Sequence, residues 1–191
     1  MRKMRSHSFH LLRVAKLEQS DSKAIIEPLD DVGEFNSQIT IDSRPLNLDK
    51  LNAQIQVNDG TNGASVVFTG SVRAAMDNKN LVGMTLEHYP GMTENQLNLI
   101  VHNAAERWRL NKVLVVHRIG HLTLGEPIVF VGVSAAHRIQ AFEGAQFIMD
   151  YLKNEATFWK KEHYQTDSLV SEEWVEAKQS DIDSLKKWQE N

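Results

Sequence analysis

Five basic side chains that could hold an anion lie within residues 134–162: His137, Arg138, Lys153, Lys160 and Lys161. Ser134 is a good helix N-cap, so a helix starting there would carry the His-Arg pair in or beside its first turn. Free backbone N–H groups and the positive end of the helix dipole gather at that turn, where each cation costs about 0.3–1 kcal/mol. A bound phosphate or sulfate would reverse this cost, because it accepts from the amides and from the arginine together. Two interpretations stay open: anion binding, or an exposed basic pair beside a neighbouring acid.

The helix expected from Ser134 also carries cations close to its apolar side. At about 100° per residue, the predicted apolar stripe contains Phe142, Ala145, Met149 and Leu152. Arg138 and Lys153 lie within about 40° of Met149, which predicts that both point inward. Either their stems pack on the core while the charged ends reach water, or they line a site. Cations at both ends of the stripe favour a lined site.

Arg138 and Lys153 are too far apart on one straight helix to hold the same small ligand. Their backbones are separated by about 22 Å at ~1.5 Å per residue. Either they bind different molecules, or a second copy of the chain brings its His137 and Arg138 beside the lysines of the first copy. We favour the second arrangement, and therefore expect a homodimer.

The elements that position these residues follow from the hydrophobic pattern. Alternating or continuous apolar runs predict strands in five places: the segment from Ser37 that Pro45 interrupts, and residues 65–69, 81–89, 113–116 and 128–133. A helix is predicted between the third and fourth of these groups, with a capping box of Thr93 and Gln96. Its apolar residues recur at helical spacing: Leu97, Ile100, Val101, Ala104, Ala105 and Trp108.

The segment 158–164 alternates in the manner of a strand, and residues 171–178 are its expected hairpin partner. If the helix continued instead, the seven-residue step from Lys153 to Lys160 would still place both lysines on one face. The order of strands, helix, strands, helix and a last hairpin predicts an α+β fold with a mostly antiparallel or mixed sheet.

Composition indicates one globular domain with additional chain. The 191 residues are 41% hydrophobic and 24% charged. We expect residues 1–36 to form an N-terminal extension and residues 37–191 to form the domain. The start of the extension is Arg-rich and free of acids, which suits a cleaved transit peptide or a solvated segment, and its apolar part is too short to span a membrane.

Charge and residue usage exclude several classes. The formal net charge is −4, so no global positive field attracts nucleic acid. The chain has no cysteine, which excludes disulfides, thiolate metal sites and a cysteine nucleophile, and fits the reducing cytoplasm. The histidines have no metal-ligand spacing, so we expect no metal. Glu87 and His88 could form an acid–base pair but fit a solvated strand face better. Neither a P-loop nor a GxSxG motif is present, which counts against a phosphotransferase or phosphatase.

A collinear series of motifs resembles one enzyme family. In order, the segments are VVFTGSVR, LEHYPGMTE, HRIG, IVFVGVSAAHR, FIMDYLK, FWKKE and WVEAK. Together they are similar to the large catalytic subunit of molybdopterin synthase, over residues 37–188. The resemblance implies an α/β hammerhead-like fold with an additional antiparallel β subdomain, and a homodimer that binds two small ubiquitin-like sulfur-carrier subunits. No bound cofactor is implied.

The activity implied by the resemblance is sulfur transfer in molybdenum cofactor biosynthesis. Cyclic pyranopterin monophosphate would be converted into molybdopterin with two sulfurs from C-terminal glycine thiocarboxylates of the carrier, which suits a chain without cysteine. Lys153 and Lys160 would be catalytic. The residues implied to bind substrate are Arg73, His137, Arg138, Lys161, Glu162, Ser71 and Val72, with Lys178 as a contact from a second protomer.

Three positions depart from the family pattern. Ser71 replaces a usual lysine, Lys178 replaces a usual arginine, and Ala156-Thr157 replaces a usual Ala-Pro pair, which weakens the expected helix stop. The first two departures leave open a non-catalytic adaptor that binds a ubiquitin-like partner. Retention of Lys153 and Lys160 favours the enzyme.

Overall fold

The computed structural model describes residues 35–56, 60–74, 80–166, 169–175 and 179–189. These belong to one compact unit, residues 34–191. Of the expected extension, residues 1–34 lie outside the described residues, as does Lys178. No helix within the described ranges is long and apolar enough to cross a membrane.

The first sheet has four strands in the order β1-β4-β6-β2. The strands are β1 (Asn36–Asp42), β4 (Leu110–Arg118), β6 (Pro127–Ala135) and β2 (Ala64–Ser71). β1 runs parallel to β4, and the other two neighbouring pairs are antiparallel. This sheet is therefore mixed, as predicted, and β2 lies at its edge.

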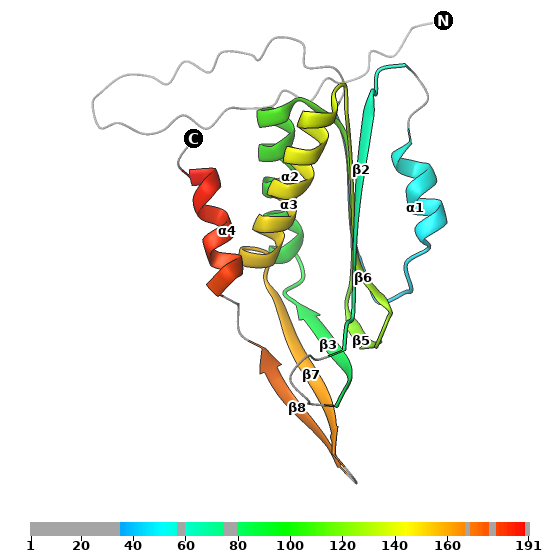
Figure 1. Ribbon diagram of the computed structural model, residues 1–191, viewed down its shortest axis with the longest axis vertical. Helices are drawn as coiled ribbons and strands as arrows, with labels where there is room; N and C mark the ends of the chain where they lie inside the picture. Colours follow the sequence, from blue (N-terminus) through cyan, green and yellow to red (C-terminus); the bar gives the residue numbers. More distant parts are fainter. Residues whose placement is uncertain (1–34, 57–59, 75–79, 167–168, 176–178, 190–191) are drawn as a thin grey trace, which may run out of the picture. The chain divides into compact units, whose positions relative to one another are not determined.

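Helices cover both faces of the first sheet (Figure 1). Helix α1 (Leu48–Ile55) packs on one face, where Leu114, Val116 and Phe130 meet Leu51 and Ile55. Helices α2 (Met92–Trp108) and α3 (Arg138–Asn154) pack on the other, against the alternate residues of β4 and β6. The continuous apolar runs of β4 and β6 follow from this arrangement, because a strand buried on both faces needs apolar residues at every position.

The second sheet is entirely antiparallel and has the order β5-β3-β7-β8. Its strands are β5 (Gly120–Thr123), β3 (Leu81–His88), β7 (Phe158–Thr166) and β8 (Leu169–Val175). The predicted hairpin is confirmed, with Leu169–Val175 as the second strand, whereas residues 176–178 of the predicted partner lie outside the described residues. The α+β fold with an additional antiparallel subdomain is also confirmed. The alternative in which α3 continues through Lys160 is wrong.

Helix α4 (Gln179–Gln189) follows the hairpin and lies beside α3 (Figure 1). Its Trp188 packs edge-on against Trp108 and Phe147 and donates its indole N–H to Asp150 Oδ2 at 2.9 Å. The hydrophobic pattern led us to expect neither α4 nor α1, nor the short strand β5. All three are short elements, for which periodicity is a weak signal.

Two predictions about α3 are wrong. Ser134 does not cap the helix: it is a fully buried residue of β6, paired with Ser65 of β2 and Lys112 of β4. The strand continues to Ala135 because it has a neighbour on each side, and the N-cap is His137. The predicted apolar stripe was also rotated, since the buried residues are Ala141, Gly144, Ala145, Phe147, Ile148 and Leu152.

The rotation moves the cations outward. Phe142 is 64% exposed, and both Arg138 and Lys153 are exposed. Gly144 explains part of the error, because a Cβ there would lie 2.9 Å from Leu110 Cδ1. The helix therefore approaches β4 closely with the face that carries small residues such as Gly144 and Ala145, and Phe142 lies on the exposed face.

The start of α2 also differs from its prediction. The N-cap is Gly91, and Glu94 rather than Gln96 completes the capping box by accepting from the Gly91 N–H at 2.6 Å. Thr93 does not cap the helix; it is buried, and its hydroxyl contacts Tyr89 and Thr157. The six predicted apolar residues of this helix are all buried, as expected.

Candidate active site

Lys153 lies in the last turn of α3, with about half of its side chain exposed. Its Nζ is 3.3 Å from Oδ1 of Asp181 in the first turn of α4. The neighbouring Asn154 donates to the backbone carbonyl of Asp181 at 2.8 Å. These contacts tie the end of α3 to the start of α4. Asp181 was not foreseen, although Ile182, Leu185 and Trp188 have the spacing of one helix face.

Lys160 lies on β7 in a chain of contacts along one face of the second sheet. Its Nζ is 2.5 Å from Glu162 Oε1, and the Tyr164 hydroxyl donates to Glu162 Oε2 at 2.5 Å. Met84 and Leu86, the cross-strand partners of Glu162 and Lys160, belong to the small apolar cluster on this face. Glu162 is therefore placed to hold the ammonium of Lys160 against an apolar wall.

Lys161 points to the opposite face of the same sheet, because successive residues of a strand alternate. Its Nζ is 3.2 Å from Glu172 Oε2 and 4.7 Å from the ring centre of Trp174, both on β8. Since β7 has strands on both sides, Lys160 and Lys161 cannot readily reach one small ligand together. The structure thus separates two lysines that are adjacent in the sequence.

The end of β2 carries three of the predicted substrate-binding residues. Ser71 is the last residue of the strand, and Val72 and Arg73 follow it. Ser71 follows a register shift in the pairing with β6, and Arg73 is exposed. Val72 is buried, and its backbone N–H donates to the Glu126 carbonyl while its carbonyl accepts from Gly125. The segment is thereby fixed to the turn between β5 and β6.

That turn is itself stabilised by Glu126. The carboxylate accepts from the Thr123 backbone N–H at 2.7 Å and from Arg118 Nη1 at 3.0 Å. These hydrogen bonds lower the pKa of Glu126 to about 2, with the Thr123 amide as the largest cause. The turn is thus held by a permanently charged carboxylate at neutral pH.

His137 and Arg138 form the N-cap and first residue of α3, so the cationic pair does lie at the helix start, as predicted. No acid occupies this first turn. Within the described part of the chain, neither side chain has a hydrogen-bond or ion-pair partner. The exposed apolar residues Ile139 and Phe142 lie next to them. The interpretation as a pair capped by a neighbouring acid finds no support among the described residues.

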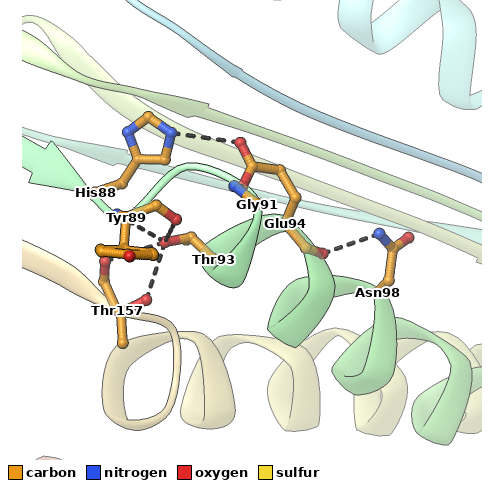
Figure 2. Close-up of polar contacts among 7 residues, drawn as sticks. All are labelled: His88, Tyr89, Gly91, Thr93, Glu94, Asn98 and Thr157. Carbon is orange, nitrogen blue, oxygen red and sulfur yellow. Dashed lines mark hydrogen bonds and ion pairs between the residues drawn. The ribbon is translucent and has the colours of Figure 1, made fainter.

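A short linker, residues 155–157, joins the helix of Lys153 to the strand of Lys160. Figure 2 shows Thr93 at the start of α2 in contact with Thr157 of this linker. The helix ends at Asn154 although no proline follows, and Glu155 is its C-cap. Neither threonine was recognised as part of the site from sequence, since a hydroxyl pair between distant segments leaves no local pattern.

Two histidines lie beside the linker. His117 is buried on β4 and stacks on Phe158 with a centroid separation of 3.8 Å. Burial lowers its pKa to about 4, and the nearby His88 adds to the lowering. His88 pairs with Glu94 at 3.3 Å rather than with Glu87 (Figure 2). Among the described residues, no group of three or more His, Asp or Glu is arranged to hold a metal ion.

Comparison with known proteins decides the family. The family model described as MoaE protein matches residues 41–155, more than half of the chain. The molybdopterin synthase catalytic subunit of Escherichia coli (strain K12) is 52% identical over 126 residues, which cover 66% of this chain and 81% of that protein. The chain belongs to the MoaE protein family.

Solved structures of the MoaE family agree with this assignment. The molybdopterin biosynthesis MoaE protein from Burkholderia ambifaria MC40-6 has a TM-score of 0.65 and 40% identity, and the match covers 80% of this chain and 98% of that chain. Molybdopterin synthase from Staphylococcus aureus has a TM-score of 0.63 and 28% identity, over 72% of this chain and 95% of that chain. The expected resemblance is therefore confirmed in sequence and in fold.

Proposed function

We propose that this chain is the catalytic subunit of a molybdopterin synthase and converts cyclic pyranopterin monophosphate into molybdopterin. The observation that carries the proposal is the 52% identity to a molybdopterin synthase catalytic subunit over most of that protein. The chain is a sulfur-transferring enzyme of molybdenum cofactor biosynthesis. Its sulfur comes from a small ubiquitin-like carrier subunit with a C-terminal thiocarboxylate, and the reaction takes place in the cytoplasm.

Each sulfur transfer has two stages. The carrier thiocarboxylate sulfur attacks a carbon of the pterin side chain, so that a carbon–sulfur bond forms and the carbon–oxygen bond at that carbon breaks, and the oxygen leaves as water or stays on the phosphate. Water then attacks the carrier carbonyl and breaks its bond to sulfur, so that the sulfur stays on the pterin and the carrier leaves as a carboxylate. Lys153 and Lys160 stabilise the oxyanions that develop in these stages. One of these lysines also transfers protons.

The contacts of the two lysines suit this role. Each already holds a carboxylate oxygen, Asp181 for Lys153 and Glu162 for Lys160. An ammonium group that binds a carboxylate can bind the thiocarboxylate end of a carrier tail by the same charge-assisted hydrogen bonds. The flexible tail reaches Lys153 by a form of C-terminal carboxylate capture.

Arg73, His137 and Arg138 bind the phosphate of the pterin. The free amides at the start of α3 and the absence of an acid from its first turn favour an anion there. Cations at both substrates are needed because a phosphate and a thiocarboxylate repel each other. Ser71 and Val72, beside Arg73, line the same substrate site, and Val72 acts through its rigid backbone.

The site is completed by a second copy of the chain. Arg138 and Lys153 lie at opposite ends of α3, at about 1.5 Å per residue over 15 residues, so one copy cannot bring them to one substrate. The exposed Ile139 and Phe142 beside the cationic pair support coverage by another copy. Lys178 is the proposed contact from the second protomer.

Glu162 and Lys161 have different places in this scheme. Glu162 orients Lys160, as its 2.5 Å contact supports. Lys161 contacts Glu172 and Trp174 on the other face, so any contact it makes with substrate involves a different part of the bound molecule. The domain of residues 37–191 carries all of these groups, with residues 1–36 as an extension.

The test is reconstitution from purified parts. The chain is mixed with thiocarboxylated carrier and cyclic pyranopterin monophosphate, and the dithiolene product is measured. Product that depends on the carrier supports the proposal. Absence of product with binding of the carrier retained would favour a non-catalytic adaptor, and product without carrier would refute the sulfur source.

A further inference from the structure

Thr93, at the start of α2, has no exposed surface, and its hydroxyl contacts two separate segments. Thr93 Oγ1 is 2.9 Å from Thr157 Oγ1 and 3.2 Å from the Thr157 carbonyl oxygen. It also accepts from the Tyr89 backbone N–H at 3.1 Å and lies 3.1 Å from the Tyr89 carbonyl oxygen. Figure 2 shows these contacts meeting at one oxygen.

The hydroxyl groups of Thr93 and Thr157 can form these hydrogen bonds in only a few combinations. A hydroxyl has one proton to donate and two lone pairs to accept with. Thr93 accepts from the Tyr89 N–H, and either threonine hydroxyl can donate to the other. When Thr157 is the donor, Thr93 is free to donate to one of the two carbonyl oxygens. Both hydroxyls have partners in this arrangement. Removal of the Thr93 hydroxyl would leave the Tyr89 N–H without its acceptor, and removal of the Thr157 hydroxyl would break the side-chain contact between α2 and the linker.

The backbone of Thr157 forms a tight turn. The Phe158 N–H donates to the Ala156 carbonyl at 2.8 Å, which is the hydrogen bond of a γ-turn centred on Thr157. Thr157 is not among the residues with positive φ, so the turn is of the inverse type, with φ near −75°. Within the described residues its own N–H donates to no acceptor. A proline would fit such a position.

Contacts on either side of Thr157 hold the rest of the linker. Gln96 Nε2 donates to Glu155 Oε2 at 2.9 Å, Ala156 is buried, and Phe158 stacks on His117. The first turns of α2 thus hold the linker at two points, Glu155 and Thr157. The chain from the linker back to Lys153 is helix, and the chain from the linker on to Lys160 is strand. The linker is therefore the direct covalent connection between the two elements that carry the lysines.

We propose that Thr93 and Thr157 are positioning residues that fix Lys153 relative to Lys160 through the hydroxyl contact between α2 and the linker. The inference rests on the proposed catalytic roles of these lysines. Misplacement of a catalytic group by about 1 Å can cost on the order of a hundredfold in rate.

The experiment compares Thr157→Val and Thr93→Val with the unchanged chain in the carrier-dependent assay. Each variant keeps the side-chain shape and removes one hydroxyl. We expect kcat to fall about ten- to hundredfold while KM for the carrier and for the pterin stays within about twofold. Thr157→Pro should retain most of kcat, because the ring fixes the turn without the hydroxyl.

Thr85→Val is the matched control. The Thr85 hydroxyl contacts His163 Nε2 at 2.8 Å on the face of the second sheet opposite Lys160, so its removal disturbs a part-buried hydroxyl away from the linker. The melting temperature of Thr85→Val should shift by about as much as that of Thr93→Val and Thr157→Val. Its kcat should stay within about twofold of the value for the unchanged chain. The comparison separates loss of stability from loss of positioning.

Near-normal kcat for both Thr157→Val and Thr93→Val would overturn the inference, and so would an equal loss in Thr85→Val. If Lys153→Ala also kept its activity, the proposed roles of the lysines would fail as well. If Lys153→Ala were inactive while the threonine variants stayed active, only the positioning inference would fail. A loss in Thr157→Pro as large as in Thr157→Val would contradict the role assigned to the turn.

Discussion

The ammonium nitrogen of Lys153 lies 3.3 Å from the carboxylate of Asp181, so the last turn of α3 and the first turn of α4 share an ion pair. The pair is formed by the proposed catalytic lysine. Both side chains are partly exposed, and such pairs contribute about 0.2–1 kcal/mol. Asp181 therefore competes weakly with any other carboxylate that approaches Lys153.

Asp181→Asn should strengthen productive binding of the thiocarboxylated carrier. Without the competing charge, we expect KM for the carrier to fall by up to about fivefold, the ratio that 1 kcal/mol represents. Steady-state kinetics at varied carrier concentration measure the change. Asp183→Asn is the matched control, because Asp183 pairs with Lys186 on the same helix at 2.6 Å and does not contact Lys153. A rise in KM for Asp181→Asn alone would show that Asp181 assists carrier binding instead.

The strong features of the fold could be predicted from the sequence because they depend on local patterns. The buried face of α2 and the apolar strands β4 and β6 follow from periodicity and composition. The start of α3 was misplaced because Ser134 has the side chain of an N-cap, while its backbone is held in a sheet between Ser65 and Lys112. Pairing between strands that are distant in the sequence cannot be inferred from the residues around Ser134.

The sequence predicted where the cationic pair of His137 and Arg138 lies, but not all the contacts of the lysines. The cationic pair at the start of α3 was placed correctly, because helix dipole arguments need only the sequence near one helix end. The opposite orientation of Lys160 and Lys161 follows from the predicted strand, because successive residues of a strand alternate. The ion pair between Asp181 and Lys153 was not predicted, because it joins two helices and does not follow from spacing along the chain.

Trans-complementation tests whether two copies build each site. A His137→Ala chain and a Lys153→Ala chain are each expected to be inactive alone. In a mixed dimer, one of the two sites would combine the intact Lys153 of the first chain with the intact His137 of the second. Co-purification of the mixed dimer with two different tags, followed by the product assay, should give about half of the normal activity per dimer. An inactive mixed dimer would mean that each site is built within one copy.

Stability should decrease with acidity because of His117. Its folded pKa of about 4 is below the unfolded value near 6.5, so the unfolded chain binds the extra proton in that interval. The contribution of neutral His117 to the free energy of unfolding is present above pH 6.5 and is lost as the pH falls toward 4. Between pH 7.5 and pH 5 we expect a loss of about 2 kcal/mol from this group.

Urea unfolding of the unchanged chain and of His117→Phe at both pH values isolates this effect. Phenylalanine keeps a ring to stack on Phe158 and cannot be protonated. The carboxylates contribute equally to both proteins and cancel in the comparison. An equal pH dependence in the two proteins would show that the neutral state of His117 does not contribute to stability.

Lys153→Ala tests the central claim most directly. In a single-turnover reaction with thiocarboxylated carrier and cyclic pyranopterin monophosphate, we expect dithiolene formation to slow at least about a hundredfold, because an oxyanion-stabilising group is removed. Carrier binding should stay within about fivefold, and folding should be preserved because this side chain is half exposed. Lys186→Ala, which removes another exposed lysine, should react normally. Near-normal product formation by Lys153→Ala would contradict the account.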